Sequence, residues 1–190
     1  MRIIAGQWRG VPIAAPKGDT TRPTVDRVRE SLMSSLNSAL CGFEGVVALD
    51  AFAGSGACGL ELLSRGAESV WFYEMNANAY ACIQANIAKL HVDERCYELR
   101  KQDVLQHIPA YGHKPFHLVV LDPPYALEAE KVFAFLDSLA ATNALAEDAV
   151  VSYEHSKDRV IDAYVQQRNW NVLAHKTFGA TVIDIFEREQ

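Results

Sequence analysis

Short apolar runs alternate with longer amphipathic segments from about residue 45 to the end of the chain. A run of four or five apolar residues is typical of a strand buried on both faces, whereas apolar residues spaced three and four apart are typical of a helix. Alternating strands and helices form a parallel sheet covered on both faces. The predicted strands are residues 46–49, 69–73, 96–99, 117–121, 149–153, 170–176 and 181–187, and the predicted helices between them are 57–65, 77–90 and 128–141.

The last two predicted strands are separated by only a few residues around Gly179. A connection this short joins antiparallel neighbours, because a parallel crossover needs about a dozen residues or more. We therefore predict an α/β fold with a mostly parallel, seven-stranded sheet that has one antiparallel edge strand.

The first 23 residues lack this alternation. Two short apolar pieces, residues 3–5 and 11–14, are interrupted by glycines and prolines, which is typical of a small hairpin or an extended arm. We therefore divide the chain into an N-terminal arm, residues 1–23, and an α/β domain, residues 24–190.

A further helix is predicted directly after Pro23. Thr24 can serve as its N-cap, and apolar side chains then recur at helical spacing. With the helix in this phase, Arg27 and Arg29 project away from the buried stripe. The stripe consists of Val25, Val28, Leu32, Leu36 and Leu40.

Composition agrees with a single globular domain. The chain has 190 residues, 49% apolar and 22% charged, which is enough for one buried core. No apolar run approaches the ~18 residues of a membrane span, and the N-terminus has no secretory signal pattern. The four cysteines and six histidines are scattered, so we expect free thiols in a reducing cytoplasm and no metal site. We also expect a monomer, since no large apolar stripe is left uncovered.

Charge is unevenly distributed along the chain. The net charge is −6, but residues 1–30 carry six basic and three acidic side chains, whereas the rest of the chain has a net charge of −9. A basic arm on an acidic body can hold phosphates locally, because charge interactions are screened beyond roughly 10 Å. A short charged segment can equally be merely solvated, so charge alone leaves a nucleic-acid partner open.

Acidic residues and glycines follow the predicted strands at the carboxyl end of the sheet, where ligands bind in such folds. Asp50 ends the first strand, and the glycines of residues 54–56 let the backbone pass close to a ligand. Glu74 ends the second strand, where a carboxylate can accept both hydroxyls of a ribose. Asp103, with the Val104 backbone, can meet the amine of an adenine ring. The candidate cofactor residues are Asp50, Phe52, Ala53, Gly54, Gly56, Glu74, Met75, Asp103 and Val104.

Two classes of cofactor match this pattern. Residues 54–59 read Gly-x-Gly-x-x-Gly and Glu74 lies 20 residues beyond Gly54, which also fits a dinucleotide. Asp50 favours S-adenosylmethionine, because a carboxylate attracts an ammonium or sulfonium group and repels a pyrophosphate. The fourth predicted strand is followed by Asp122-Pro123-Pro124-Tyr125. This motif also favours S-adenosylmethionine, since hydride transfer has no use for it. A nicotinamide-dependent oxidoreductase is kept as an alternative.

The fourth predicted strand ends in Asp122-Pro123-Pro124-Tyr125. The lone pair of an aromatic amine is delocalised into its ring, so methylation needs acceptors that hold both amine hydrogens while the nitrogen becomes tetrahedral. The Asp122 carboxylate and the Pro123 carbonyl can supply them, and the prolines stiffen the loop. Tyr125 offers a face for stacking an extruded base, and Asp122 can accept the departing proton. The competing interpretation is a proline-rich loop with a buried tyrosine.

Several stretches of the chain match one known family. They are residues 22–30 (RPTVDRVRE), 50–56 (DAFAGSG) and 122–125 (DPPY), with residues 2–10 (RIIAGQWRG) and 176–179 (KTFG) at the two ends. In this order and in so short a chain, they resemble the small bacterial 16S ribosomal RNA guanine-N2 methyltransferases over nearly the whole length. Phe178 departs from the tyrosine that is common there, which affects one hydroxyl contact.

The resemblance implies a Rossmann-like class I methyltransferase that uses S-adenosylmethionine. It further implies that the target is one guanine of 16S ribosomal RNA, in an assembled or partly assembled 30S subunit in the cytoplasm. Asp122 to Tyr125 would hold the guanine amine, and the candidate cofactor residues would hold the methyl donor. The residues that would contact RNA are Arg9, Arg22, Arg27 and Arg29.

Two further functions are left open. An adenine-N6 methyltransferase uses the same tetrapeptide, but the short segment between the third and fourth strands leaves no room for a target-recognition insertion. A noncatalytic, cofactor-binding assembly factor is possible in principle, although the intact Asp122 and glycine loop argue against it. Trp8 can stack on a base or anchor the arm, and Glu154 can line the site or be solvated.

Overall fold

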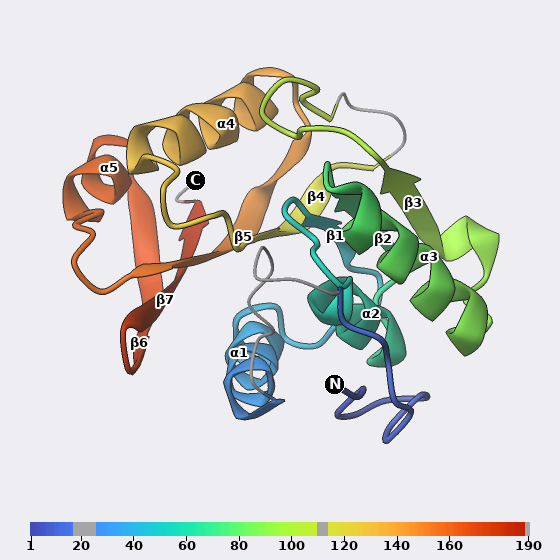
Figure 1. The fold of residues 1–190 in the computed structure, drawn as a ribbon. Coiled ribbons are helices and arrows are strands. Elements are labelled where there is room, and N and C mark those ends of the chain that lie inside the picture. Colours follow the sequence, from blue (N-terminus) through green and yellow to red (C-terminus); the bar gives the residue numbers. More distant parts are fainter. Residues whose placement is uncertain (17–25, 110–113, 189–190) are drawn as a thin grey trace.

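A single sheet of seven strands forms the centre of the computed structural model, which describes residues 1–16, 26–109 and 114–188 (Figure 1). The strands are β1 (Val47–Asp50), β2 (Ser69–Tyr73), β3 (Tyr97–Arg100), β4 (Phe116–Leu121), β5 (Leu145–Ser156), β6 (Trp170–Phe178) and β7 (Thr181–Arg188). Their order is β3-β2-β1-β4-β5-β7-β6. Neighbours from β3 to β5 are parallel, whereas β7 is antiparallel to both β5 and β6. The prediction of a mostly parallel sheet with antiparallel pairing at one edge is therefore confirmed.

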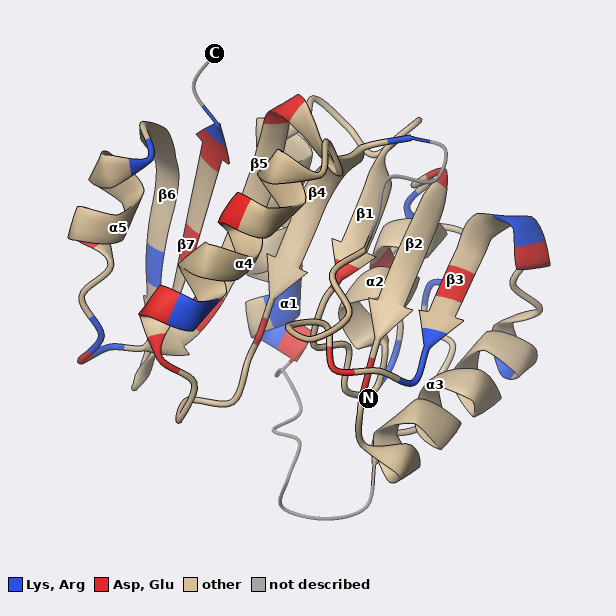
Figure 2. Ribbon diagram, turned by 90° about the horizontal axis from the view of Figure 1, so that it is seen from above, with Lys and Arg blue, Asp and Glu red and all other residues tan. Residues whose placement is uncertain are grey.

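Helices cover both faces of this sheet (Figure 1). One face carries α1 (Asp26–Ala39), α2 (Ala57–Ser64) and α3 (Ala77–Leu90), and the other carries α4 (Ala129–Ala141) and α5 (Asp162–Gln167). Figure 2 shows β2 and β4 without charged residues along their length, as expected for strands covered on both sides. None of the helices within the described ranges is long and apolar enough to cross a membrane.

Element boundaries lie within two residues of the prediction, except at β5. This strand begins at Leu145 rather than at residue 149. The prediction started too late because the exposed Glu147 and Asp148 interrupt the apolar run, near a register shift against β4. The sequence also missed α5 and a 3-10 turn, η1 (Glu94–Cys96). Elements of three to six residues are too short to show a helical period.

The described part of the N-terminal arm forms a hairpin that packs against α2. The Ile3 N–H donates to the Val11 carbonyl at 3.0 Å, and the Gly10 N–H donates back to Ile3 at 2.8 Å. Ile3 is buried in the same apolar cluster as α2. The next two backbone N–H groups donate to the Glu61 carboxylate at 2.8 and 2.9 Å. Residues 17–25, which include the expected N-cap and Arg22, lie outside the described residues.

The predicted phase of the first helix was wrong at Arg29, whose side chain is 0% exposed instead of facing RNA. The buried face of α1 consists of Arg29, Leu32, Met33 and Leu36. Residues at spacings of three, four and seven share one face of a helix, so Arg29 belongs to the buried stripe by its position. Its charge alone suggested exposure. Arg27 is exposed, as predicted.

The buried guanidinium of Arg29 lies against acidic side chains. Its Nη2 donates to the Arg2 carbonyl at 2.5 Å and to the Asp26 carboxylate at 3.1 Å. Its Nε lies 3.9 Å from Oε2 of Glu61, which is itself 0% exposed. A buried charge is tolerated when an opposite charge and hydrogen bonds compensate it. Arg29 therefore ties α1 to both α2 and the arm.

Candidate active site

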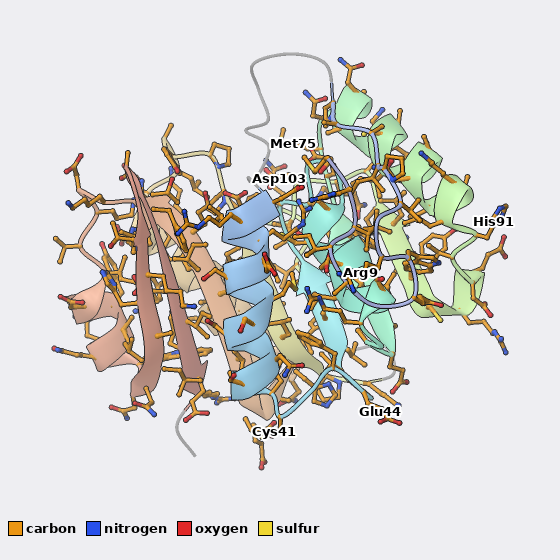
Figure 3. All side chains as sticks on the ribbon, turned by 90° about the horizontal axis from the view of Figure 1, so that it is seen from below. Arg9, Cys41, Glu44, Met75, His91 and Asp103 are labelled. Atoms are coloured by element: carbon orange, nitrogen blue, oxygen red, sulfur yellow. The ribbon has the colours of Figure 1, made fainter. Side chains whose placement is uncertain are left out.

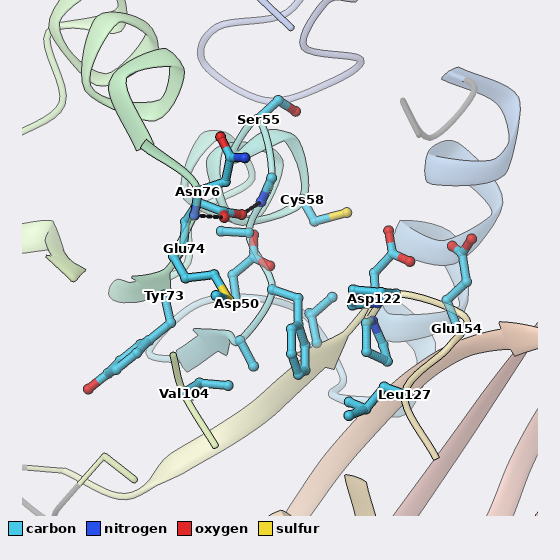
Figure 4. A pocket seen from close by; sticks show the side chains of 18 of the residues that line it. Asp50, Ser55, Cys58, Tyr73, Glu74, Asn76, Val104, Asp122, Leu127 and Glu154 are labelled. Atoms are coloured by element: carbon cyan, nitrogen blue, oxygen red, sulfur yellow. Dashed lines mark hydrogen bonds between the residues drawn. The ribbon is translucent and has the colours of Figure 1, made fainter. Parts of the chain in front are cut away.

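A cleft of about 1040 Å³ opens at the carboxyl ends of the central strands (Figure 4). Loops that follow β1, β2, β3 and β4 contribute to its wall, together with Glu154 of β5. The structure thus brings together residues that lie far apart in the sequence, from Met1 to Glu154. The predicted site residues that line the cleft are Asp50, Phe52, Ala53, Gly54, Glu74, Met75, Asp103, Val104, Asp122, Pro123, Pro124 and Tyr125.

Gly56 is the one predicted cofactor residue that does not line this cleft among the described residues. It is the N-cap of α2 and has a φ of 76°, a left-handed conformation that favours glycine. A Cβ at this position would lie 3.2 Å from the Ile83 side chain of α3. Gly56 therefore shapes the turn that carries the preceding residues past the cleft.

Glu74 fastens the glycine loop to the end of β2. Its Oε2 accepts from the Gly54 N–H at 2.8 Å, and its Oε1 accepts from the Asn76 N–H at 2.6 Å (Figure 4). Backbone N–H groups thus hold both oxygens of the Glu74 carboxylate in place. The side chain is placed at the rim of the cleft, where a ligand hydroxyl can reach it.

Asp50 is the buried acid of the cleft, with only 3% of its surface exposed. Burial raises its pKa to about 7, opposed by a hydrogen bond from the Gly59 N–H at 3.0 Å and reinforced by the negative charge of Glu74. No positive charge of the described residues is among the causes of this shift. A cationic ligand group bound beside Asp50 would supply that charge and favour ionisation.

Residues after β2 and β3 form the part of the cleft suited to a planar ring. Val104 is buried in the wall and the Met75 side chain is exposed at the opening. Asp103 is oriented by the Leu105 N–H, which donates to its Oδ1 at 3.0 Å. The apolar surfaces and the carboxylate together fit an adenine ring with its exocyclic amine.

The loop after β4, residues 122–127, forms the opposite wall and is called the catalytic loop below. The Leu127 N–H donates to the Pro124 carbonyl at 2.8 Å, which closes the loop on itself. The Tyr125 hydroxyl shares a 2.6 Å hydrogen bond with Thr181 Oγ1, and the residue as a whole is 36% exposed. The tyrosine is therefore not a buried core residue, and its ring is accessible to a stacking partner.

Sequence reasoning missed several parts of the cleft. Cys58 lies near Asp122 and Glu154 (Figure 4). Burial and then the charge of Asp50 raise the Cys58 pKa well above its usual range, so this thiol stays protonated and is a poor nucleophile. Met1, Ala15 and Pro16 of the arm also line the cleft, as do Ser55, Asn76, Gln102 and Leu127. No local pattern signals the arm residues, because only folding brings them to the loops.

The two residues left open by the sequence now have a location. Trp8 is half-buried and packs against the core cluster of α2, and its backbone N–H donates to Ser64 Oγ at 3.0 Å. It therefore anchors the arm. Glu154 lines the cleft beside the catalytic loop. Among the predicted RNA contacts, Arg9 is exposed on the arm, where Figure 3 shows it in front of α2 in the view from below.

The donor set of the cleft fits S-adenosylmethionine. Asp50 suits a cationic group, Glu74 suits a ribose, and Asp103 with its apolar neighbours suits an adenine ring. The sheet order and the position of the glycine loop define a Rossmann-like fold of the class I methyltransferase type. Two solved structures share it over 100% of this chain and 98% of their own length, each at 30% identity. They are a putative methyltransferase yhhF from Escherichia coli, with a TM-score of 0.81, and a putative methylase HI0767 from Haemophilus influenzae, with a TM-score of 0.77.

The chain belongs to the family described as Conserved hypothetical protein 95, whose sequence model matches residues 1–187. One relative is the putative rRNA methyltransferase YlbH of Bacillus subtilis, 31% identical over 99% of both chains. Another is the ribosomal RNA small subunit methyltransferase D of Haemophilus influenzae, 32% identical over 98% of this chain and 93% of the relative. The predicted family resemblance is therefore confirmed.

Proposed function

We propose that this protein transfers a methyl group from S-adenosylmethionine to the exocyclic N2 amine of a guanine in 16S ribosomal RNA. The observation that carries this proposal is that Asp122 to Tyr125 and the acidic cofactor residues line one cleft. Family membership and the names of the relatives support methylation of ribosomal RNA. The guanine-N2 target rests on the family resemblance of the sequence motifs.

The chemistry assigned to the catalytic loop follows from its composition. S-adenosylmethionine supplies an electrophilic methyl group on a sulfonium. The Asp122 carboxylate and the Pro123 carbonyl accept hydrogen bonds from the two amine hydrogens, which localises the nitrogen lone pair toward the methyl group. Asp122 then takes the proton that leaves the methylated nitrogen. Tyr125 supports the base by stacking on its ring.

On the cofactor side of the cleft, each residue is assigned one part of the methyl donor. Asp50 pairs with the cationic amino acid end of the donor, and Glu74 accepts the ribose hydroxyls. Asp103 accepts from the adenine amine, and Met75 and Val104 contact the ring. These acceptors orient the donor so that its methyl group faces the catalytic loop.

RNA is proposed to approach over the basic arm and α1. Arg9 and Arg27 are exposed there and can contact phosphates, and the sequence adds Arg22. Arg29 is withdrawn from this set because it is buried. We further propose that the protein acts as a monomer in the cytoplasm, on an assembled or partly assembled 30S subunit.

Transfer of a radiolabelled methyl group tests the proposal directly. Three substrates are compared, namely 30S subunits, naked 16S RNA and DNA, and the labelled nucleoside is identified after digestion. We expect label in N2-methylguanosine from RNA or subunits. The Asp122→Ala variant is expected to lose at least 100-fold in kcat, since positioned acceptors and general bases contribute about 10²–10⁴-fold.

Other outcomes separate the alternatives. Label in N6-methyladenine would overturn the target base while keeping the cofactor. Absence of label, together with undisturbed binding of S-adenosylmethionine, would favour a noncatalytic assembly factor. Binding of NADH in place of S-adenosylmethionine would favour an oxidoreductase.

A further inference from the structure

Arg159, which follows β5, reaches across to the catalytic loop. Its Nη2 donates to the Tyr125 carbonyl at 2.6 Å, and its Nη1 donates to the Leu127 carbonyl. Nη1 also donates to the Tyr153 hydroxyl at 3.1 Å. A guanidinium presents its donors in a rigid, planar fork, so it fixes two carbonyls relative to each other as well as to β5.

A second side chain outside the motif holds the same loop. Thr181, at the start of β7, is 9% exposed and shares the 2.6 Å hydrogen bond with the Tyr125 hydroxyl. This hydrogen bond fixes the end of the Tyr125 side chain, and Tyr125 lines the cleft. Arg159 and Thr181 therefore fasten the backbone and the side chain of one residue from two different strand ends.

The catalytic loop depends on such side chains because of its composition. Pro123 and Pro124 have no N–H and cannot take part in backbone ladders as donors. The internal bond from the Leu127 N–H to Pro124 closes the loop but does not attach it to the sheet. The contacts of Arg159 and Thr181 attach the loop to the segment after β5 and to the start of β7.

We propose that Arg159 is a positioning residue that, together with Thr181, sets the catalytic loop in the conformation that receives the target base. The inference rests on the proposed function and extends it to a residue outside the recognised motifs. Arg159 itself does not line the cleft among the described residues. It acts by holding Tyr125 and the preceding Asp122 and Pro123 at a fixed place in the cleft.

Steady-state methylation of 16S RNA by Arg159→Ala and Arg159→Lys tests the proposal. Misplacement of reacting groups by about 1 Å can cost on the order of 100-fold in rate, so we expect Arg159→Ala to lose about 10- to 100-fold in kcat. Its affinity for S-adenosylmethionine, measured by calorimetry, should stay within about twofold of the wild type. Added guanidinium ion should restore part of the kcat of Arg159→Ala, and Arg159→Lys should be only partly active because one ammonium cannot reproduce the fork.

Arg168→Ala is the matched control. Arg168 also donates through a guanidinium, to the Tyr164 carbonyl at 3.2 Å and to Asp137 at 2.7 Å, but these partners lie in α5 and α4 and not in the catalytic loop. Its loss is expected to leave kcat unchanged. Equal losses of kcat, cofactor affinity and melting temperature in both variants would show a general structural role and overturn the proposal, as would wild-type kcat in Arg159→Ala.

Hydrogen exchange separates a failure of this inference from a failure of the proposed function. The loop is monitored through the exchange rates of three backbone amides, those of Tyr125, Ala126 and Leu127. We expect them to exchange faster in Arg159→Ala than in the wild type or in Arg168→Ala, whatever substrate the protein methylates. Unchanged hydrogen exchange at these amides would overturn the positioning role of Arg159, even if the enzyme is active. A wild-type protein that methylates no RNA, but whose loop is loosened by Arg159→Ala, overturns the proposed function alone.

Discussion

Asp50 combines deep burial with a neighbouring negative charge. Both effects disfavour its ionised form, and only the Gly59 N–H counteracts them. The sequence predicted an acid at this strand end, but its pKa of about 7 comes from the surrounding structure. Whether the residue is charged at neutral pH therefore depends on what is bound beside it.

Binding of S-adenosylmethionine is expected to strengthen as the pH rises from 6 to 8. A cationic ligand selects ionised Asp50, and with a pKa of about 7 the ionised fraction rises from roughly a tenth to nine-tenths over this range. The dissociation constant should therefore fall about tenfold. Calorimetric titration at several pH values measures it.

Asp50→Asn is the control for this pH dependence. The amide cannot ionise, so any remaining change with pH comes from the ligand or from other residues. The prediction fails when the wild type and Asp50→Asn show the same pH profile.

The position of α1 depends on contacts with its neighbours, α2 and the arm. Its buried face includes Arg29, which pairs with Glu61 of α2 and with Asp26 on its own first turn. Glu61 also accepts from the backbone of the arm and from Arg65 at 2.8 Å. One buried carboxylate thus links three segments.

Arg29→Ala is expected to lower the free energy of unfolding by about 2–5 kcal/mol, because it leaves a cavity in the core and removes one of the two cations beside the buried Glu61 carboxylate. Arg27→Ala, on the exposed face of the same helix, should change it by less than about 0.5 kcal/mol. Urea denaturation followed by circular dichroism measures both. Similar stability of the two variants would argue against a structural role for Arg29.

At the scale of the whole molecule, the arm and the body carry opposite net charges. Residues 1–30 have a net charge of +3 and the rest of the chain has −9. The arm is packed onto α2 and contributes Met1, Ala15 and Pro16 to the cleft wall. The proposed RNA-binding surface and part of the cleft wall therefore belong to one segment.

Arg9→Ala is expected to weaken RNA binding uniformly across sequences. One lost phosphate contact reduces the slope of log affinity against log salt by about 0.7–0.9. Fluorescence anisotropy with a 16S RNA fragment at several salt concentrations gives the slope. Arg95→Ala serves as control, because Arg95 is exposed and paired with Asp93 near β3 at 2.6 Å. Equal slopes for the two variants and the wild type would remove Arg9 from the RNA-binding surface.

The sequence by itself determined the seven strands, the four longer helices and the residues at the strand ends. Apolar periodicity depends only on which face of each element is buried. It therefore located the seven strands and the helices that alternate with them. In a parallel sheet all carboxyl ends lie at one edge. Asp50, Glu74, Asp103 and the catalytic loop were therefore predicted to meet, and the structure places them around one cleft.

The tertiary structure alone decided the contacts made between distant segments. Glu61 accommodates Arg29 on the buried face of α1, and Arg159 meets the catalytic loop from 32 to 34 positions away. Such contacts depend on how elements pack in three dimensions, and they leave no period in the chain. For the same reason the arm residues of the cleft wall and the raised pKa of Asp50 appear only once the chain is folded.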